Sequence, residues 1–376
     1  MLPSIPYFSR WPAILTAVIA NRPHSRETRG VDASRTLRGI ADRVGRWPVG
    51  RVRRASQLLS SLVSLAIGVR FALWAEQVSS GNLHPSVSRP AGVEGWLPIS
   101  ALVSLRHWIA TGEYNLARPA GLAIFLTILG VSLLFKKGFC GWLCPIGFLT
   151  ELLGAAGRWA LGRNLKPPKA LDYPLRSLKY LLLGFFLLAI LGMDGRATTA
   201  FVYGDYNAVA DILMLRFFTR ISPTALGVLL FLAGAAFFVR GFWCRYLCPY
   251  GALLGILGLA SPTRIVRRGE SCIACRKCSR ACPAGIPVDR VAEVRSDECI
   301  GCLDCVAACP VRPTLEVSVV RRRWTVKPVW WGLALMATFW GALLLIRAFG
   351  PWQSSIPNER VAGIMADVRA GRVPSH

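Results

Sequence analysis

Residues 272–283 read Cys-Ile-Ala-Cys-Arg-Lys-Cys-Ser-Arg-Ala-Cys-Pro, and residues 299–310 repeat this cysteine spacing as Cys-Ile-Gly-Cys-Leu-Asp-Cys-Val-Ala-Ala-Cys-Pro. Steps of two residues let one tight loop present three thiolates to an iron–sulphur cluster, while the fourth cysteine, before proline, reaches the other cluster. The two runs therefore predict two 4Fe-4S clusters with crossed ligands. The first set is Cys272, Cys275, Cys278 and Cys309, and the second set is Cys299, Cys302, Cys305 and Cys282.

Two other uses of these cysteines fit the sequence less well. Structural zinc sites also contain Cys-x2-Cys units, but they normally pair two separate units rather than run four cysteines together. Disulfides are disfavoured because thiolate-rich metal runs belong on the reducing side of a membrane. We expect residues 262–326 to form a small α+β domain of the bacterial two-cluster ferredoxin type.

The rest of the chain has the composition of a membrane protein. Its 376 residues are 53% hydrophobic, yet the formal net charge is +25, so the charge must be segregated from the apolar segments. Five apolar stretches approach the roughly 20 residues that a helix needs to cross a bilayer. They are Gln57–Ala75, Pro119–Phe135, Leu178–Met193, Thr224–Val239 and Val329–Phe349. We predict an α-helical polytopic membrane protein with about five transmembrane helices and the ferredoxin domain inserted before the last one.

The basic residues indicate the orientation of the chain. They concentrate before the first stretch, after the second, and between the fourth and the fifth. By the positive-inside rule these regions are cytoplasmic, which predicts a bacterial inner-membrane protein with a cytoplasmic N-terminus, cytoplasmic cysteines and a periplasmic C-terminus. The predicted parts are a basic, loosely ordered tail, a transmembrane domain with two repeated units, the ferredoxin domain, and a last helix with a short periplasmic tail. They cover residues 1–54, 55–261, 262–326 and 327–376.

Several charged and aromatic residues have structural explanations. The arginines at 321–323 precede the fifth stretch and are better explained as a topology signal at lipid headgroups than as a nucleic-acid site. Arg70 lies inside the first stretch, where it either snorkels to the interface or contacts a quinone or a carboxylate. Glu151 is expected on a helix surface. Tryptophans near the ends of the stretches are expected to anchor the interface: Trp74, Trp142, Trp243, Trp330, Trp331 and Trp352.

A second pair of cysteine motifs forms an internal repeat. Residues 138–147 read Gly-Phe-Cys-Gly-Trp-Leu-Cys-Pro-Ile-Gly after the second stretch, and residues 242–251 read Phe-Trp-Cys-Arg-Tyr-Leu-Cys-Pro-Tyr-Gly after the fourth. Because both preceding stretches run inward, an axis along the membrane normal would relate the two units. That arrangement would place Cys140, Cys144, Cys244 and Cys248 at one depth.

These four cysteines are compatible with several chemistries. The i, i+4 spacing puts both sulphurs of a pair on one face of a helical turn. Two such faces could supply thiolates to a third iron–sulphur cluster, to a copper or zinc ion, or to a dithiol redox pair. Small buried cysteines that pack helices are the structural alternative. Haem, flavin and nicotinamide cofactors are not expected, since none of the four histidines lies centrally in a predicted span and no glycine-rich dinucleotide fingerprint is present.

The combined motifs resemble those of the membrane polyferredoxins related to NapH and NosR, from about Arg54 onward. Within that family the chain is most similar to the YccM-like electron transport proteins, through Gly92-Val-Glu-Gly-Trp-Leu-Pro98, Cys244-Arg-Tyr-Leu-Cys-Pro-Tyr-Gly251, Ile286-Pro-Val-Asp289 and Trp352-Gln353. The resemblance implies electron transfer between a membrane quinone pool and a redox partner. It carries over the cysteine roles but no quinone-site residues, and the flavin-bearing outer domain of NosR-type relatives has no counterpart here.

We therefore expect an electron carrier within a membrane complex. Its partners would be the quinone pool or a cytoplasmic donor, and a respiratory redox protein or multihaem cytochrome. A role as a quinol-oxidising oxidoreductase subunit stays open, and no catalytic residue is assigned. The alternative is an accessory protein for metalloenzyme assembly, which reduces or delivers a metal or maintains thiols through the Cys-x3-Cys-Pro pairs. Basic residues around the first run, from Arg264 to Arg280, would favour the reduced cluster, act as topology signals or dock an acidic carrier.

Overall fold

The computed structural model describes residues 44–45, 47–165, 167–320, 324–370 and 372. Residues Gly45–His376 form one unit. Most of the predicted N-terminal tail and the arginines at 321–323 lie outside the described residues. Helix α2 begins at Val49, so its first turns fall within the last residues that were predicted as tail.

Three helices are long and apolar enough to cross a bilayer. They are α2 (Val49–Ser79), residues Ala170–Leu191 of α7 (Lys169–Leu191), and α14 (Pro328–Phe349). These helices overlap the first, third and fifth predicted stretches. Only 17% to 28% of their apolar windows is buried inside the protein, so most of their hydrophobic surface is free to face lipid. The chain is therefore a mostly helical membrane protein.

The second and fourth predicted stretches are less regular. Helix α4 (Pro119–Phe135) is apolar but has only 17 residues, and α10 (Pro223–Phe238) follows α9 (Asp205–Thr219) after a bend of 79°. Pro223 accounts for the break, because proline lacks an N–H and disfavours a helical residue before it. The bent pair would add a fourth crossing if it formed one span. The count of five transmembrane helices stays a prediction.

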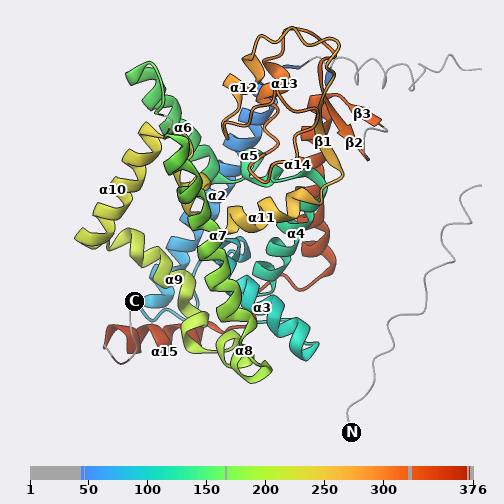
Figure 1. The fold of residues 1–376 in the computed structure, drawn as a ribbon. Helices are drawn as coiled ribbons and strands as arrows, with labels where there is room; N and C mark the ends of the chain where they lie inside the picture. Colours follow the sequence, from blue (N-terminus) through green and yellow to red (C-terminus); the bar gives the residue numbers. More distant parts are fainter. Residues whose placement is uncertain (1–43, 46, 166, 321–323, 371, 373–376) are drawn as a thin grey trace, which may run out of the picture. The chain divides into compact units, whose positions relative to one another are not determined.

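Two units with the same order of elements carry the Cys-x3-Cys-Pro motifs (Figure 1). The first consists of α4, α5 (Gly138–Trp142) and α6 (Pro145–Leu161), and the second of α10, the π-helical turn η2 (Trp243–Leu247) and α11 (Pro249–Leu259). The units exchange partners, since α6 packs against α10 and α11 packs against α4. This reciprocal packing brings together two turns that are far apart in the sequence.

The ferredoxin module contains a small antiparallel sheet of order β1-β2-β3. Strand β1 (Thr263–Arg267) pairs with β2 (Leu315–Val319), and β2 pairs with β3 (Trp324–Val326). The two cysteine runs lie between β1 and β2 in sequence and include the short helices α12 (Lys277–Ala281) and α13 (Asp304–Ala307). The sheet therefore holds together both ends of the segment that carries the runs.

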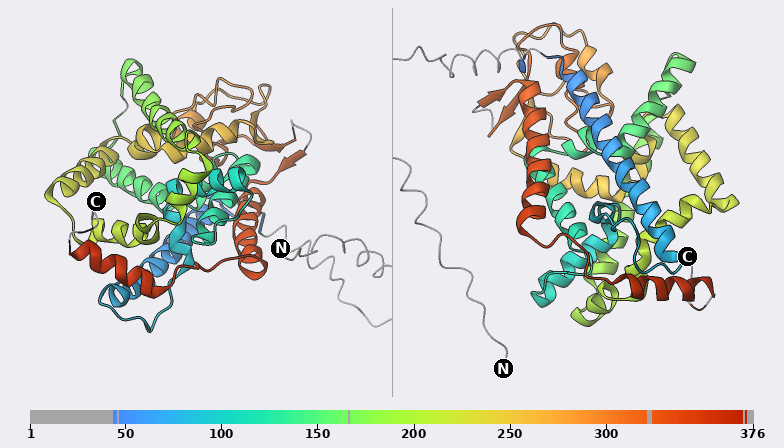
Figure 2. Two further views of the ribbon diagram at one scale, coloured as in Figure 1. Left: turned by 90° about the horizontal axis from the view of Figure 1, so that it is seen from below. Right: turned by 180° about the vertical axis from the view of Figure 1, so that it is seen from behind.

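The opposite end of this unit has a hydrophobic core of its own. Figures 1 and 2 show α8 (Gly195–Val202) and α15 (Asn358–Arg369) at the end away from the ferredoxin module. Phe71 and Trp74 of α2 are buried there with Ile212 of α9 and Met365 of α15. The elements η1 (Ala91–Trp96) and α3 (Pro98–Thr111) complete this end, where η1 packs on α4 and α3 packs on α8.

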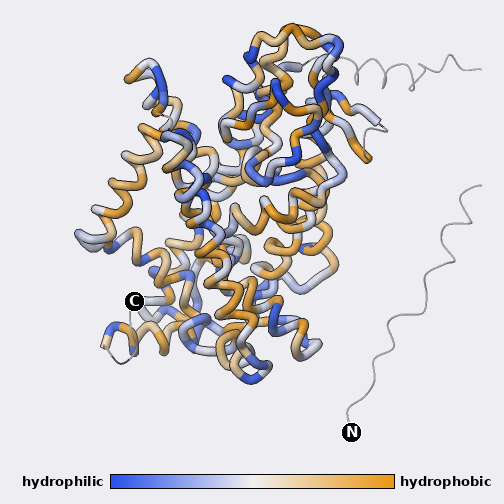
Figure 3. The backbone as a smooth tube through the Cα atoms, in the orientation of Figure 1, coloured by the Kyte–Doolittle hydropathy of each residue, from blue (hydrophilic) through white to orange (hydrophobic). Residues whose placement is uncertain are grey.

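Hydrophobic residues dominate helices such as α4, α10 and α14, whereas hydrophilic residues gather in the ferredoxin loops (Figure 3). The tryptophans do not follow the simple expectation of interface anchors. Trp74, Trp142 and Trp331 are at most 3% exposed, because they fill contacts between protein elements. Trp330 is 38% exposed and remains compatible with an interfacial position.

Candidate functional site

The first pocket of the ferredoxin module is lined by Cys272, Cys275, Cys278 and Cys309. Three of these cysteines come from the first run, whereas Cys309 comes from the second. Hydrogen bonds from the backbone of Ala274 and the side chain of Arg267 lower the pKa of the Cys272 thiol. They favour the thiolate, which is the form that binds iron.

The second pocket is lined by the remaining cysteines of the two runs, Cys282, Cys299, Cys302 and Cys305. Three of them, Cys299, Cys302 and Cys305, are buried. The structure thus brings the eight ferredoxin cysteines together in two sets, and each set takes one cysteine from the other run.

The backbone of the two runs has the same special conformation at equivalent places. Ala274 and Gly301 have φ of 54° and 59°, and Arg276 and Leu303 have φ of 59° and 62°. Left-handed backbone costs a non-glycine residue roughly 1–2 kcal/mol. It reverses the chain between successive cysteines, so that three thiols from one short loop face one pocket. Strain of this kind clusters at ligand sites.

Both pockets fit an iron–sulphur cluster better than a single ion. All twelve cysteines are free thiols. Among the described residues, no three His, Cys, Asp or Glu side chains converge closely enough to hold one metal ion. A zinc ion would require sulphurs at about 2.3 Å from the metal. Each pocket instead is lined by four thiols, which matches the four corner ligands that a 4Fe-4S cluster takes.

Arg53 of α2 joins the second run to the membrane helices. Its Nε donates a hydrogen bond to the carbonyl oxygen of Gly141 at 2.9 Å, and its guanidinium pairs with Asp304 at 3.1 Å and with Glu151. Arg53 is only 4% exposed. Glu151, whose side chain is 28% exposed, therefore pairs with a buried cation, a role beyond the helix-surface position expected for it. A single sequence cannot show this role, because the partners are far apart in the chain.

Further contacts hold the second run against α5 and α7. The indole N–H of Trp142 donates a hydrogen bond to the Gly301 carbonyl oxygen at 2.9 Å. Lys179 of α7 pairs with Glu298, and the hydroxyl of Tyr180 donates to Asp297. The second run is thus fixed to the membrane part by polar contacts from three different helices.

The four other cysteines occupy equivalent places in the two repeated units. Cys140 lies in α5 and Cys244 in η2, while Cys144 and Cys248 are the N-cap residues of α6 and α11. All four line one cavity. The glycine that ends the motif permits the tight turn, since a Cβ on Gly147 would lie 2.5 Å from the Cys140 carbonyl oxygen. The structure therefore brings the four cysteines together, as their common depth predicted.

Electrostatics at this four-thiol site favour ligation over free thiol chemistry. Burial, with a smaller contribution from neighbouring cysteines, raises the pKa of Cys144 to about 12 and that of Cys244 to about 11. The positive charge of Lys137 acts to lower the pKa of Cys244 and of Cys140. The backbone N–H of Gly251 donates to the Cys248 sulphur at 3.2 Å. Thiols that stay protonated are poor nucleophiles, whereas a bound metal stabilises the thiolates directly.

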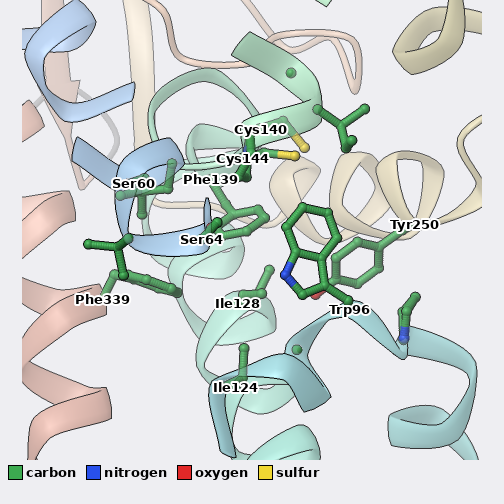
Figure 4. A pocket seen from close by; sticks show the side chains of 18 of the residues that line it. Ser60, Ser64, Trp96, Ile124, Ile128, Phe139, Cys140, Cys144, Tyr250 and Phe339 are labelled. Carbon is green, nitrogen blue, oxygen red and sulfur yellow. The ribbon is translucent and has the colours of Figure 1, made fainter. Parts of the chain in front are cut away.

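The cavity beside the four thiols is large and mostly apolar. It has a volume of about 850 Å³. Figure 4 shows the rings of Trp96 and Tyr250 projecting into it from η1 and α11, near Cys140 and Cys144. Its wall also includes Pro283, Ala284 and Ile300, and these three residues line the second ferredoxin pocket as well. The two sites are therefore separated by a single layer of residues.

Comparisons with known proteins agree with the cysteine motifs. A family model described as a 4Fe-4S binding domain matches residues 117–164 and again residues 221–268, so the same model covers both Cys-x3-Cys-Pro units. A second model, described as a 4Fe-4S dicluster domain, matches residues 264–310. The internal repeat is thus supported independently of the structure.

Three curated relatives show how far the similarity extends. YccM of Escherichia coli, described as an electron transport protein, is 40% identical over 82% of this chain and 87% of its own length. NapH of Haemophilus influenzae, a ferredoxin-type protein, is 28% identical over 64% of this chain and 77% of its own length. NirI of Paracoccus denitrificans is 32% identical over 53% of this chain but 30% of its own length. No solved structure matches the chain.

Proposed function

Because the chain belongs to the family of ferredoxin-type membrane proteins that includes YccM and NapH, we propose that it transfers electrons between the quinone pool and a respiratory redox partner. The iron–sulphur character of this transfer follows from the family and its 4Fe-4S domains. A cytoplasmic donor in place of quinol would reverse the direction of flow. The chain would act as an electron carrier within a complex.

The succession of three cysteine-lined sites is the observation that carries the proposal. The first ferredoxin pocket and the second exchange one cysteine each, and the second shares a wall with the four-thiol cavity. Clusters held in these sites would supply one-electron chemistry. The order of the sites supports a path from the exposed first run, through the buried second run, to the membrane.

We assign the first cluster to Cys272, Cys275, Cys278 and Cys309, and the second to Cys299, Cys302, Cys305 and Cys282. The four-thiol site would hold a third cluster with Cys140, Cys144, Cys244 and Cys248 as ligands. The 4Fe-4S model that matches both repeats supports this choice over copper, zinc or a dithiol pair. So does the finding that, among the described residues, no three His, Cys, Asp or Glu side chains are placed to hold a single metal ion.

The membrane orientation follows from the same proposal. The ferredoxin module would face the bacterial cytoplasm, where thiolate-bound iron stays reduced, and the C-terminal helix would face the periplasm. The separation of α15 from the ferredoxin module in Figure 1 is compatible with this orientation. Basic side chains near the first run would attract an acidic redox protein.

Iron content tests the three-cluster relay. We expect anaerobically purified protein to contain about 12 irons per chain, from three four-iron clusters. Replacing Cys140 and Cys244 together by serine should lower the content to about 8 irons and leave two cluster signals in low-temperature EPR spectra. Cys272→Ser is the matched variant, because it should remove the first cluster and leave the four-thiol site intact.

Other outcomes identify the rival functions. A wild-type content of about 8 irons that is unchanged in the Cys140/Cys244 variant would contradict the third cluster. Bound copper and Cu(II) reduction that disappear in that variant would then support the role in metalloenzyme assembly. Loss of every cluster from the double variant would contradict the separation of the sites.

A further inference from the structure

The motifs Gly92–Pro98 and Trp352-Gln353, which supply no cysteine to the three proposed cluster sites, meet at the cavity beside the four thiols. Gly92, Gly95 and Trp96 come from one motif, Trp352 and Gln353 come from the other, and all line the cavity beside the four thiols. Leu344 of α14 also lines the cavity and is 64% exposed. The cavity therefore reaches the lipid-facing surface, from which a lipid-soluble ligand can enter.

Glu94 lies in the middle of the first motif and is 1% exposed. Its Oε2 accepts a hydrogen bond from the Gly121 backbone N–H at 2.9 Å. Its Oε1 is buried and has no hydrogen-bond partner within the described part of the chain. A buried carboxylate oxygen without a partner is costly, so this group calls for a functional explanation.

A second cavity places Glu94 between the membrane and water. This cavity has a volume of about 660 Å³ and is lined by Glu94 and by segments near residues 83–91 and 353–358. Arg70, Arg89 and Gln353 line both cavities. Glu94 therefore borders the second cavity, while its neighbours Gly95 and Trp96 border the first.

The charged groups around Glu94 set its proton affinity. Burial raises the pKa of Glu94 to about 7, although Arg118 and Arg89 oppose this shift and Asp211 adds to it. Both arginines are also bound to Asp211, at 3.1 Å and 2.5 Å. Tyr114 is a further neighbour, and His84 lines the second cavity. Glu94 can thus hold or release a proton near neutral pH.

We propose that Glu94 exchanges protons with a quinone bound in the large cavity and passes them to water through the second cavity. This inference rests on the proposed exchange of electrons with the quinone pool. Arg70, which donates a hydrogen bond to Ser88 at 2.8 Å, lies at the junction of the two cavities. Its position there supports a contact with the ligand or the proton path, beyond simple snorkelling.

The step balances in electrons and protons. A quinol that becomes a quinone loses two electrons and two protons. A cluster held by the four thiols would be the oxidant, and it would take the electrons one at a time and pass each to the ferredoxin clusters. The proton released with each electron would pass along the residues that line both cavities to the Glu94 carboxylate, which borders the second cavity, and would leave through that cavity before the next transfer. When a quinone is reduced instead, the protons move in the reverse direction, from the Glu94 carboxyl to the quinone.

The test uses the full iron-loaded protein in lipid nanodiscs, mixed anaerobically with a short-chain ubiquinol or naphthoquinol. We expect the rate of cluster reduction in the wild type to rise as the pH increases through about 7. Glu94→Gln should slow this reduction roughly 100-fold and abolish its pH dependence, and Glu94→Asp should recover part of it. Reduction by dithionite should be unchanged in all variants. Glu113→Gln, an exposed acid in the same segment, is the matched control.

A second measurement does not depend on turnover. Infrared difference spectra between quinol-bound and quinone-bound wild type should contain a protonated-carboxyl band that Glu94→Gln removes and Glu113→Gln retains. Unchanged rates, pH profile and carboxyl band in Glu94→Gln would overturn this inference alone. The proposed function would fail as well if the ubiquinol and the naphthoquinol both left the clusters of the wild type oxidised and its tryptophan fluorescence unchanged. If Glu94→Gln failed to retain its iron, the proposal would be tested by the pH profile of the wild type and by the protonated-carboxyl band of Glu94→Asp.

Discussion

The two cysteine runs share one spacing and one backbone conformation, yet their intervening residues meet different surroundings. Ile273 of the first run is 63% exposed, whereas its counterpart Ile300 lines both the second pocket and the membrane cavity. Lys277 is exposed, whereas its counterpart Asp304 pairs with Arg53. The cysteines thus define the cluster fold, and the residues between them decide which run docks on the membrane helices and which stays exposed.

Exchanging the charged residue between the runs should have the largest effect. Asp304→Lys would place a cation against the buried Arg53, and we expect a loss of stability at the lower end of about 3–5 kcal/mol, because Arg53 keeps Glu151 but exchanges its second partner for a like charge. Lys277→Asp changes an exposed residue at the equivalent place and should cost less than about 1 kcal/mol. Thermal unfolding in detergent and the EPR signal of the second cluster would measure both. Similar losses in the two variants would remove the distinction between docked and free runs.

The left-handed positions allow a smaller and more local test. A Cβ on Gly301 would lie 2.7 Å from the Trp331 ring, so we expect Gly301→Ala to destabilise the protein by about 1–3 kcal/mol through overpacking. Ala274→Gly at the equivalent place relieves left-handed strain and should be neutral or slightly stabilising. The measurement is the midpoint of thermal unfolding. A tolerated Gly301→Ala would show that the second run can move away from α14.

The smallest expected effect is on the cluster potentials. Lys136 is 3% exposed and interacts electrostatically with Cys299, whereas Arg267 lies beside Cys272 in a more open position. Removing a nearby cation destabilises the reduced cluster. Lys136→Met should therefore lower the potential of the second cluster by tens of millivolts, and Arg267→Gln should lower that of the first by less, because solvent screens it. A redox titration followed by EPR measures the two reduction potentials. A larger potential shift in the Arg267 variant would mean that the first cluster, not the second, is the one shielded from solvent.

Part of the molecule was predictable because the deciding interactions are local. The x2, x2, x3 spacing groups the ferredoxin cysteines, since three thiols in one short loop can reach only one cluster. Apolar length identified α2, α7 and α14 as membrane helices, and the combined motifs identified the family. The bend between α9 and α10 shows the limit of this approach, because composition alone does not reveal whether two apolar helices form one span.

The amino-acid sequence by itself determined the iron–sulphur family, the membrane character and the pairing of motifs, because periodicity and spacing along the chain are sufficient for these. Only the tertiary structure decided that the two Cys-x3-Cys-Pro turns meet, since that depends on α6 packing against α10 and α11 against α4. It also decided that Arg53, Glu151 and Asp304 form one network and that Glu94 is buried between two cavities. These features depend on contacts between residues far apart in the chain, whose geometry no single stretch of sequence contains.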